Sequence, residues 1–250
     1  MTRLIAAALL GSTLLAMPAM AFDISSMSDS EKEDFGKAVR EYLMANPEVL
    51  VESIGVLEER QAVQSADNDR KLVATNKDAI FEDGHSWVGG NPDGDITVVE
   101  FLDYRCGYCR QFNDQVHALV EKDPNVRLIL KEYPILGQDS ETSARFAVAV
   151  KQIGGDEVYM KAHDALMALR GPASLEALGK IAGDIGVDAD EVINLMNTES
   201  VTEVLRSNRQ LGERMAIQGT PTFIVGEEML RGVPQTGLEA VVKKVREDRG

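Results

Sequence analysis

Apolar side chains recur at helical spacing in the N-terminal part of the chain, between about residues 28 and 75. Ser28 and Glu31 have the spacing of a capping box, which predicts that a helix begins there. Pro47 interrupts the pattern and suits the first turn of a second helix. The second helix carries an apolar stripe made of Leu50, Ile54 and Leu57.

The sequence alone does not determine which surface this apolar stripe packs against. The stripe could pack on the rest of the chain, or it could pair with a second copy of itself. Residues 61–78 are mostly polar, and a polar helical linker would hold the stripe away from the body of the protein. This favours self-association, and we expect a homo-oligomer, either a dimer or a trimer.

The remainder of the chain alternates between strand-like and helical patterns. Two runs rich in β-branched and apolar residues predict buried strands, and the helical pattern between them predicts a strand–helix–strand unit. A long helical block follows, and then a short hairpin and a closing helix. The expected positions are 96–102 and 126–130 for the two strands, about 139–216 for the helical block, 222–225 and 229–231 for the hairpin, and about 238–245 for the closing helix.

The first residues have the pattern of an export signal. Arg3 supplies a positive charge, an apolar run covers residues 4–17, and Ala19-Met20-Ala21 matches a small-x-small cleavage site. The apolar run is too short for a membrane span, so an uncleaved anchor is the weaker alternative. We expect cleavage after Ala21 and a mature protein in the periplasm, an oxidising compartment where disulfides persist.

The charge balance excludes several classes of partner. The chain has 250 residues, with 26 Lys and Arg against 41 Asp and Glu, so its formal net charge is −15. A nucleic-acid binder needs a concentrated basic surface, and so does a polybasic membrane-surface protein. Hydrophobic residues make up 44% and charged residues 27% of the chain, which is typical of a globular protein and not of a disordered one.

The only two cysteines of the chain carry its clearest candidate chemistry. Cys106 and Cys109 lie where the first predicted strand gives way to a helix. Unpaired backbone N–H groups at a helix start favour a thiolate, and Arg105 and Arg110 add positive charge beside the pair. Cys106 is nearest the helix start and is the expected nucleophile. Cys109 lies one turn later, where it can attack and resolve a mixed disulfide.

Two alternatives to redox chemistry would use the same cysteine pair. A structural disulfide that closes so small a loop would constrain little of the unfolded chain. A metal site would need further ligands, and His85, His117 and His163 are not at ligand spacing in the sequence. We therefore expect redox chemistry, with no resident metal and no other dissociable cofactor.

Three segments of the chain resemble the DsbA family of thiol–disulfide oxidoreductases, and in particular its ScsC-like branch. They contain Val-Glu-Phe-Leu-Asp-Tyr-Arg-Cys-Gly-Tyr-Cys-Arg at residues 99–110, Glu-Tyr-Pro-Ile-Leu-Gly at 132–137 and Gly-Thr-Pro-Thr-Phe-Ile-Val at 219–225. The segment around residues 42–48 is similar to the N-terminal oligomerisation segment of that branch. The resemblance implies an α/β thioredoxin fold with a helical insertion at about residues 138–216, preceded by an N-terminal helical segment.

The resemblance also implies a division of the chain and a set of site residues. The expected parts are a signal peptide at 1–21, an N-terminal helical oligomerisation segment at 22–78 and a DsbA-like thioredoxin domain at 79–250. Thr220 and Pro221 would be joined by a cis peptide bond and would face the cysteines. Together with Tyr108 they would bind substrate. Glu100 resembles the buried acid of such folds, a candidate proton relay, although a carboxylate turned to solvent is an equal alternative.

The function implied is thiol–disulfide exchange on cysteine-containing exported proteins, as an isomerase or an oxidase. Gly107-Tyr108 stands between the cysteines where DsbA has Pro-His, so extreme oxidising power is not expected. The Cys-Gly-Tyr-Cys sequence is similar to that of isomerases of the DsbC type. A DsbB-like or a DsbD/ScsB-like membrane protein would be the redox partner. The alternative function is a periplasmic copper(I)-handling protein that uses the same two thiolates.

Overall fold

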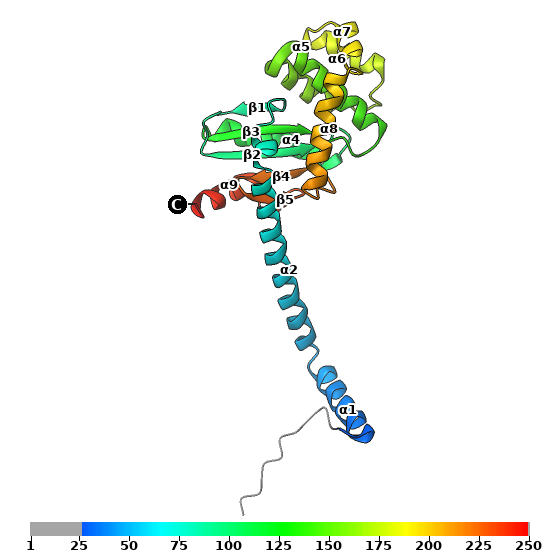
Figure 1. Ribbon diagram of the computed structural model, residues 1–250, viewed down its shortest axis with the longest axis vertical. Helices are drawn as coiled ribbons and strands as arrows, with labels where there is room; N and C mark the ends of the chain where they lie inside the picture. Colours follow the sequence, from blue (N-terminus) through cyan, green and yellow to red (C-terminus); the bar gives the residue numbers. More distant parts are fainter. Residues whose placement is uncertain (1–26, 250) are drawn as a thin grey trace, which may run out of the picture. The chain divides into compact units, whose positions relative to one another are not determined.

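The computed structural model describes residues 27–249 (Figure 1). The predicted signal sequence and its cleavage site after Ala21 therefore lie outside the described residues. The chain divides into two compact units, Met1–Glu59 and Arg60–Gly250. None of the helices between residues 27 and 249 is long and apolar enough to cross a membrane.

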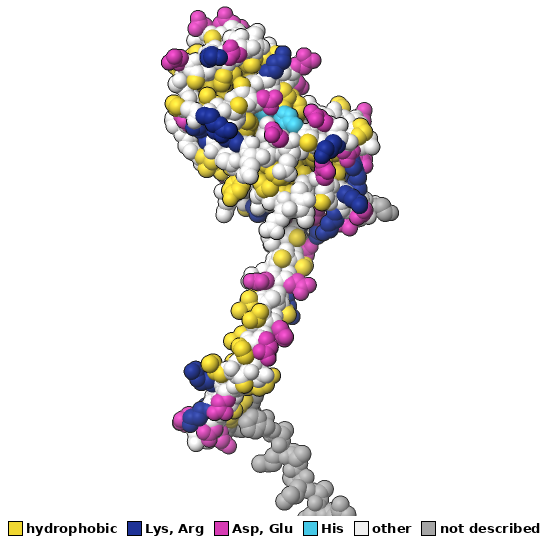
Figure 2. All heavy atoms as spheres, turned by 180° about the vertical axis from the view of Figure 1, so that it is seen from behind, with side chains coloured by type: hydrophobic (Ala, Val, Ile, Leu, Met, Phe, Trp, Pro, Cys, Tyr) yellow, Lys and Arg dark blue, Asp and Glu magenta, His cyan; other side chains and the backbone are white. Residues whose placement is uncertain are grey.

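The N-terminal unit contains α1 (Asp29–Ala45) and the first part of α2 (Glu48–Thr75). The predicted capping box is confirmed, because the Ser28 hydroxyl accepts from the Glu31 N–H and the Glu31 carboxylate accepts from the Ser28 N–H. None of the residues of α1 is buried. Exposed apolar side chains lie along both helices (Figure 2), and they are Phe35, Val39, Tyr42, Met44, Leu50, Val51, Ile54, Val56 and Leu57.

The C-terminal part of α2 belongs to the second unit and packs on the sheet of that unit. Val73 is buried in an apolar cluster on one face of the sheet. Asp69 accepts a hydrogen bond from Arg231 at 2.7 Å, and Arg70 forms an ion pair with Glu228 at 2.7 Å. The last turns of the polar stretch that the sequence indicated as a linker are thus held by side chains of strand β5.

A five-stranded mixed sheet forms the centre of the second unit (Figure 1). The strand order is β1-β3-β2-β4-β5, and β2 and β3 pair in parallel while the other pairs are antiparallel. The predicted strand–helix–strand unit and hairpin are present. The strands are β1 (Trp87–Gly90), β2 (Ile96–Leu102), β3 (Val126–Glu132), β4 (Thr222–Val225) and β5 (Glu228–Arg231).

Strand β1 was not expected from the sequence. Two consecutive glycines such as Gly89 and Gly90 are typical of a turn, whereas Trp87–Gly90 pairs with β3 along the edge of the sheet. Gly90 has a φ of 72°, and a Cβ at this position would lie 2.4 Å from the carbonyl oxygen of Val126. Glycine is therefore needed here for a close approach of two backbones within a strand rather than for a turn.

Helices cover both faces of the sheet. The larger apolar cluster includes residues of α4, α5 and α9 together with Val98 and Leu102 of β2. The smaller cluster lies on the opposite face, where Val99 and Phe101 of β2 meet residues of α2, α3 and α8. The remaining helices are α3 (Lys77–Phe81), α4 (Gly107–Lys122), α5 (Gln138–Ala168), α6 (Leu175–Ile185), α7 (Ala189–Leu195), α8 (Glu199–Arg214) and α9 (Leu238–Glu247).

The predicted helical block corresponds to α5 through α8, between β3 and β4. Asp188 caps α7 by accepting from the Glu191 N–H at 2.9 Å. Gly155 interrupts α5 with a φ of 73°, so α5 consists of two helical parts joined at a kink. The mixed sheet with this helical insertion confirms the predicted α/β thioredoxin fold of the DsbA-like type.

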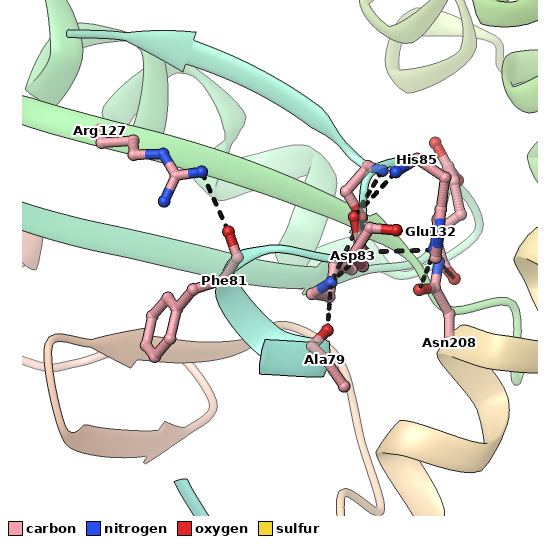
Figure 3. A network of polar contacts seen from close by, with 9 residues as sticks. Ala79, Phe81, Asp83, His85, Arg127, Glu132 and Asn208 are labelled. Atoms are coloured by element: carbon pink, nitrogen blue, oxygen red, sulfur yellow. Dashed lines mark hydrogen bonds and ion pairs between the residues drawn. The ribbon is translucent and has the colours of Figure 1, made fainter. Parts of the chain in front are cut away.

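Polar contacts of Ala79, Phe81 and Asp83 hold α3 and the segment after it beside the sheet (Figure 3). Lys131 of β3 is fully buried, donates to the carbonyl oxygen of Ala79 at 3.0 Å and pairs with Asp83. Burial acts to raise the pKa of Asp83, but the Lys131 ammonium and hydrogen bonds from Ser86 outweigh it and lower that pKa to about 2. The ion pair thus holds the chain beside the strand that supports the functional site.

Candidate functional site

The turn between β2 and α4 is shaped by a buried carboxylate that sequence reasoning did not single out. Asp103 accepts from the N–H groups of Arg105 at 2.8 Å, Ile135 at 2.8 Å and Leu136 at 3.0 Å. Its side chain therefore accepts hydrogen bonds from backbone N–H groups of two loops, one before β3 in the sequence and one after it. No local pattern would reveal this role, because two of the three donors lie beyond that strand.

Cys106 is the N-cap residue of α4. Its sulfur accepts from the Cys109 N–H at 3.5 Å, and its thiol donates to the Thr220 carbonyl oxygen at 3.0 Å. Cys106 is 6% exposed, while Cys109, the next turn along, is fully buried. Both cysteines are free thiols, so the structure represents the reduced form of the pair.

The two thiols have opposite acidities. A hydrogen bond with the Cys109 side chain is the largest cause that lowers the pKa of Cys106, burial opposes it, and the backbone N–H groups of Cys109 and Tyr108 add to the lowering. The resulting pKa of Cys106 is about 5. The same hydrogen bond, together with burial, raises the pKa of Cys109. Cys106 is therefore a thiolate at neutral pH, and Cys109 retains its proton.

The flanking arginines have structural partners. Arg105 donates to the carbonyl oxygen of Gly171 at 2.9 Å, and Arg110 donates to that of Tyr104 at 2.6 Å. The sequence indicated that both would stabilise the thiolate. The structure instead identifies hydrogen bonds at the start of α4 as the cause of the low Cys106 pKa.

The Thr220–Pro221 peptide bond is cis and lies against the cysteines, as expected. The Thr220 side-chain oxygen is buried without a hydrogen-bond partner among the described residues. Tyr108 is 68% exposed and lines a hollow beside the pair. The other residues of this hollow come from α4 and from the loop before α9, and they are Gln111, Phe112, Gln115, Val233, Pro234, Gln235 and Gly237.

Glu100 faces the interior, so the alternative of a carboxylate turned to solvent is wrong. It lies in β2 between Val99 and Phe101, so it shares the face that α4 covers. It is 2% exposed, and burial raises its pKa to about 8, with contributions from Cys106 and Glu132. A carboxyl group with this pKa can exchange a proton near neutral pH.

A second buried acid was missed by sequence reasoning. Glu132, at the end of β3, accepts from the hydroxyls of Tyr104 and Tyr159, each at 2.7 Å. The Tyr104 hydroxyl also lies 3.2 Å from Nδ1 of His163. Burial raises the pKa of Glu132 to about 8, although the two tyrosines act to lower it. A glutamate shortly after the predicted strand 126–130 was the one available signal for this network.

Comparison with known families accounts for most of the chain. The DSBA-like thioredoxin domain matches residues 97–242, and the copper resistance protein ScsC N-terminal domain matches residues 31–64. The first match covers more than half of the chain and includes both cysteines and Pro221. The chain belongs to the DsbA-like thioredoxin family. Its ScsC-like N-terminal match agrees with the branch that the sequence motifs indicated.

Solved structures of DsbA-like proteins support this assignment. A thioredoxin-like oxidoreductase from Silicibacter pomeroyi is 39% identical, covers 69% of this chain and 98% of its own, and superposes with a TM-score of 0.63. The catalytic domain of Proteus mirabilis ScsC is 26% identical, covers 70% of this chain and 97% of its own, and has a TM-score of 0.63.

Curated relatives of the DsbA-like chain include thiol:disulfide interchange proteins. DsbA of Burkholderia cepacia is 26% identical over 172 residues, which cover 63% of this chain and 79% of that protein. A Na(+)/H(+) antiporter, NhaA 1 of Salinispora arenicola, is also 26% identical, over 139 residues. The chain spans only 21% of the length of this antiporter.

The pKa of Cys106 can be measured directly by titration. In the reduced protein, the ultraviolet absorbance of the thiolate should rise with a midpoint near pH 5. Cys109→Ala removes the largest cause of the lowering, so the midpoint should increase but stay below the free-thiol value of about 8.5, because the backbone N–H groups remain. A wild-type midpoint near 8.5 would contradict the site geometry.

Glu100→Gln should flatten the pH dependence of stability in the reduced protein. The pKa of Glu100 is about 8 when folded and about 4.3 when unfolded. Between these values the folded state holds a proton that the unfolded state has lost, so stability falls as pH rises. One such proton contributes a slope of about 1.4 kcal/mol per pH unit. Urea unfolding at several pH values between about 5 and 8 measures the slope.

The control for this experiment is Glu157→Gln, because Glu157 is an exposed glutamate of α5. This variant should keep the wild-type slope. A Glu100→Gln protein that loses stability with pH as steeply as the wild type would show that Glu100 is ionised in the folded state at neutral pH.

Proposed function

We propose that this protein catalyses thiol–disulfide exchange on cysteine-containing exported proteins, with Cys106 as the nucleophile. The observation that carries the proposal is the environment of the Cys106 sulfur. It caps the start of α4, its pKa is about 5, and it is the more exposed of the two cysteines. A group with these properties is ionised and accessible at neutral pH, as an attacking thiol must be.

The exchange proceeds in two balanced steps. The Cys106 thiolate attacks one sulfur of a substrate disulfide, so a mixed disulfide forms and the second substrate sulfur leaves as a thiolate. Cys109 then loses its proton and attacks the Cys106 sulfur, which releases the first substrate thiolate and leaves the Cys106–Cys109 disulfide. The substrate is reduced by two electrons and the protein is oxidised. The reverse sequence oxidises a substrate dithiol.

Glu100 is the proposed proton acceptor for the second step. Cys109 is buried and its pKa is raised, so it needs a base before it can attack. Glu100 lies on the same covered face of the sheet, and its charge contributes to the raised pKa of Cys109. With a pKa of about 8, Glu100 is ionised in roughly one molecule in ten at pH 7, and in that form it takes up a proton more readily than an exposed carboxylate does.

Substrate binding is proposed for Thr220, Pro221 and Tyr108. The Thr220 carbonyl oxygen lies 3.0 Å from the Cys106 sulfur, so a chain held along this loop would present its own sulfur to the nucleophile. Tyr108 is exposed beside an open hollow and offers an aromatic face. Recognition mainly through backbone groups suits an enzyme that accepts many sequences.

We further propose that the N-terminal helical segment, residues 22–78, holds the protein in a homo-oligomer, a dimer or a trimer. The match to the ScsC N-terminal domain and the exposed apolar side chains of α1 and α2 support this proposal. Burying a Leu or Ile side chain contributes about 1.5–3 kcal/mol. Two or more Cys106 sites in one assembly favour isomerase activity, because one substrate can be held while its disulfides are reshuffled.

The proposed location is the periplasm, after cleavage of the export signal at Ala21. An exported oxidoreductase needs a source or sink of electrons, and the proposed partner is a DsbB-like or DsbD/ScsB-like membrane protein. The location is supported by a structural relative from Salmonella enterica serovar Typhimurium, a periplasmic thioredoxin-like protein that is 31% identical to this chain.

A second candidate function is copper(I) handling by the same two thiolates. The observation that favours it is the family name of the N-terminal match, which refers to copper resistance. The raised pKa of Cys109 disfavours it, because a thiolate pair is needed to hold a soft ion. Stoichiometric copper(I) binding that is lost on Cys109→Ser, in a protein without exchange activity, would support this candidate instead.

Trapping experiments test the direction of attack. Cys109→Ser should accumulate mixed disulfides with substrate proteins, because Cys106 still attacks but nothing resolves the product. Cys106→Ser should accumulate none and should lose exchange activity by several orders of magnitude. Mass spectrometry of the conjugates identifies the linked residue, and mixed disulfides that form through Cys109 in the Cys106→Ser protein at wild-type rates would reverse the assignment.

Point variants in α2 test the oligomerisation segment. Ile54→Asp places a charge in the exposed apolar stripe and should give a monomer by light scattering, whereas Glu58→Gln, an exposed change one turn away, should leave the assembly unchanged. The monomer should keep its ability to reduce simple disulfides and lose most refolding activity on a scrambled substrate. A wild-type monomer, or an Ile54→Asp monomer with full isomerase activity, would contradict the proposal.

A further inference from the structure

Two histidines that are far apart in sequence meet between α4 and α5, away from the cysteine pair. His117 of α4 and His163 and Asp164 of α5 each present a ligand atom, and these three atoms lie within 4.8 Å of one another. Among the residues that the structure describes, no other three His, Cys, Asp or Glu side chains come together in this way. Nε2 of His117 is 3.5 Å from the Asp164 carboxylate.

His117 and Asp164 border an open pocket on the surface of the second unit, and His163 is buried beside them. His117 is about one-third exposed and Asp164 more than half exposed, so an ion from solvent can reach both. Asn113 and Glu121 lie one helical turn before and after His117 and line the same pocket. The remaining lining residues are Arg110, Asp114, Ala118, Met167, Ala168 and Arg170.

The hydrogen bonds around His163 bear on which of its nitrogens can bind a metal ion. When the Tyr104 hydroxyl donates its proton to Glu132, the hydrogen between Tyr104 and Nδ1 of His163 comes from the imidazole, and Nε2 carries a lone pair. In the structure Nε2 lies 2.8 Å from Oδ1 of Asn113, so this tautomer requires a half-turn about the last side-chain bond of Asn113, which turns its NH2 toward Nε2.

The imidazole of His163 is buried, and its ring centroid lies 6.0 Å from that of His117. A neutral ring with one nitrogen donating to a hydroxyl and the other presenting a lone pair is the form that binds metal ions. The Tyr104–Glu132 pair supplies the outer hydrogen bond that orients such a ligand.

We propose that His117, His163 and Asp164 form a binding site for a divalent transition-metal ion with the preferences of zinc. Two imidazoles and one carboxylate are ligands that Zn²⁺ accepts in a tetrahedral site with a fourth position open to water. The ion would displace the Asn113 amide from Nε2 of His163. The site is separate from the thiolates and needs no change in their redox state.

The test uses the oxidised full-length protein, in which the Cys106–Cys109 disulfide removes both thiolates as competing ligands. Co²⁺ serves as the spectroscopic probe and Zn²⁺ as its competitor. We expect one equivalent of Co²⁺ to bind, with visible absorption typical of tetrahedral coordination, and Zn²⁺ to displace it. His117→Gln and Asp164→Asn, both at solvent-accessible positions, should each weaken binding more than about tenfold.

The matched control is His85→Gln, which removes a histidine that lies outside the pocket, next to Asp83. It should bind Co²⁺ as tightly as the wild type. Absence of stoichiometric Co²⁺ and Zn²⁺ binding in the oxidised protein, unchanged binding in His117→Gln, or an equal loss in His85→Gln would each overturn the site. None of these results depends on exchange activity, so they leave the proposed function standing.

Discussion

The hydrogen bonds to the Cys106 sulfur at the start of α4 are the interaction on which the rest of the site depends. They give the sulfur a pKa of about 5, and they exist only if α4 begins at Gly107 and Cys106 stays in an extended conformation. Asp103 secures that turn by accepting from three backbone N–H groups. The Thr220–Pro221 loop closes the opposite side, so one sulfur is exposed enough to react and its partner is buried.

The same arrangement buries ionisable groups under the cysteines. Burying such groups costs folding free energy, which the apolar core must offset. Glu100 and Glu132 share the covered face of the sheet, and each has a pKa of about 8. The parallel β2–β3 pair, with α4 and α5 packed over it, supplies the apolar surroundings that raise both values. The burial of these two glutamates therefore affects both the stability of the fold and the proton transfer at the cysteines.

Local patterns in the sequence were sufficient for most elements and for the cysteine pair. The capping residues Ser28 and Asp188, the apolar run at β2 and the cysteine spacing act over a few residues, so the sequence alone predicts them. Strand β1, the role of Asp103 and the meeting of His117 with His163 depend on contacts between distant segments. Glycines at 89 and 90 pointed to a turn, because the close backbone approach that requires glycine at position 90 is visible only in three dimensions. The orientation of Glu100 was undecided for the same reason.

The central claim, that Cys106 is an activated nucleophile while Cys109 is held protonated, is tested most directly by the rate of alkylation as a function of pH. The reduced protein is treated briefly with iodoacetamide at a series of pH values, and mass spectrometry locates the label. The account predicts labelling of Cys106 alone, with a rate that levels off above about pH 6, one unit above the Cys106 pKa of about 5. Labelling of Cys109, or a Cys106 rate that keeps rising until about pH 8.5 as for an ordinary thiol, would contradict it.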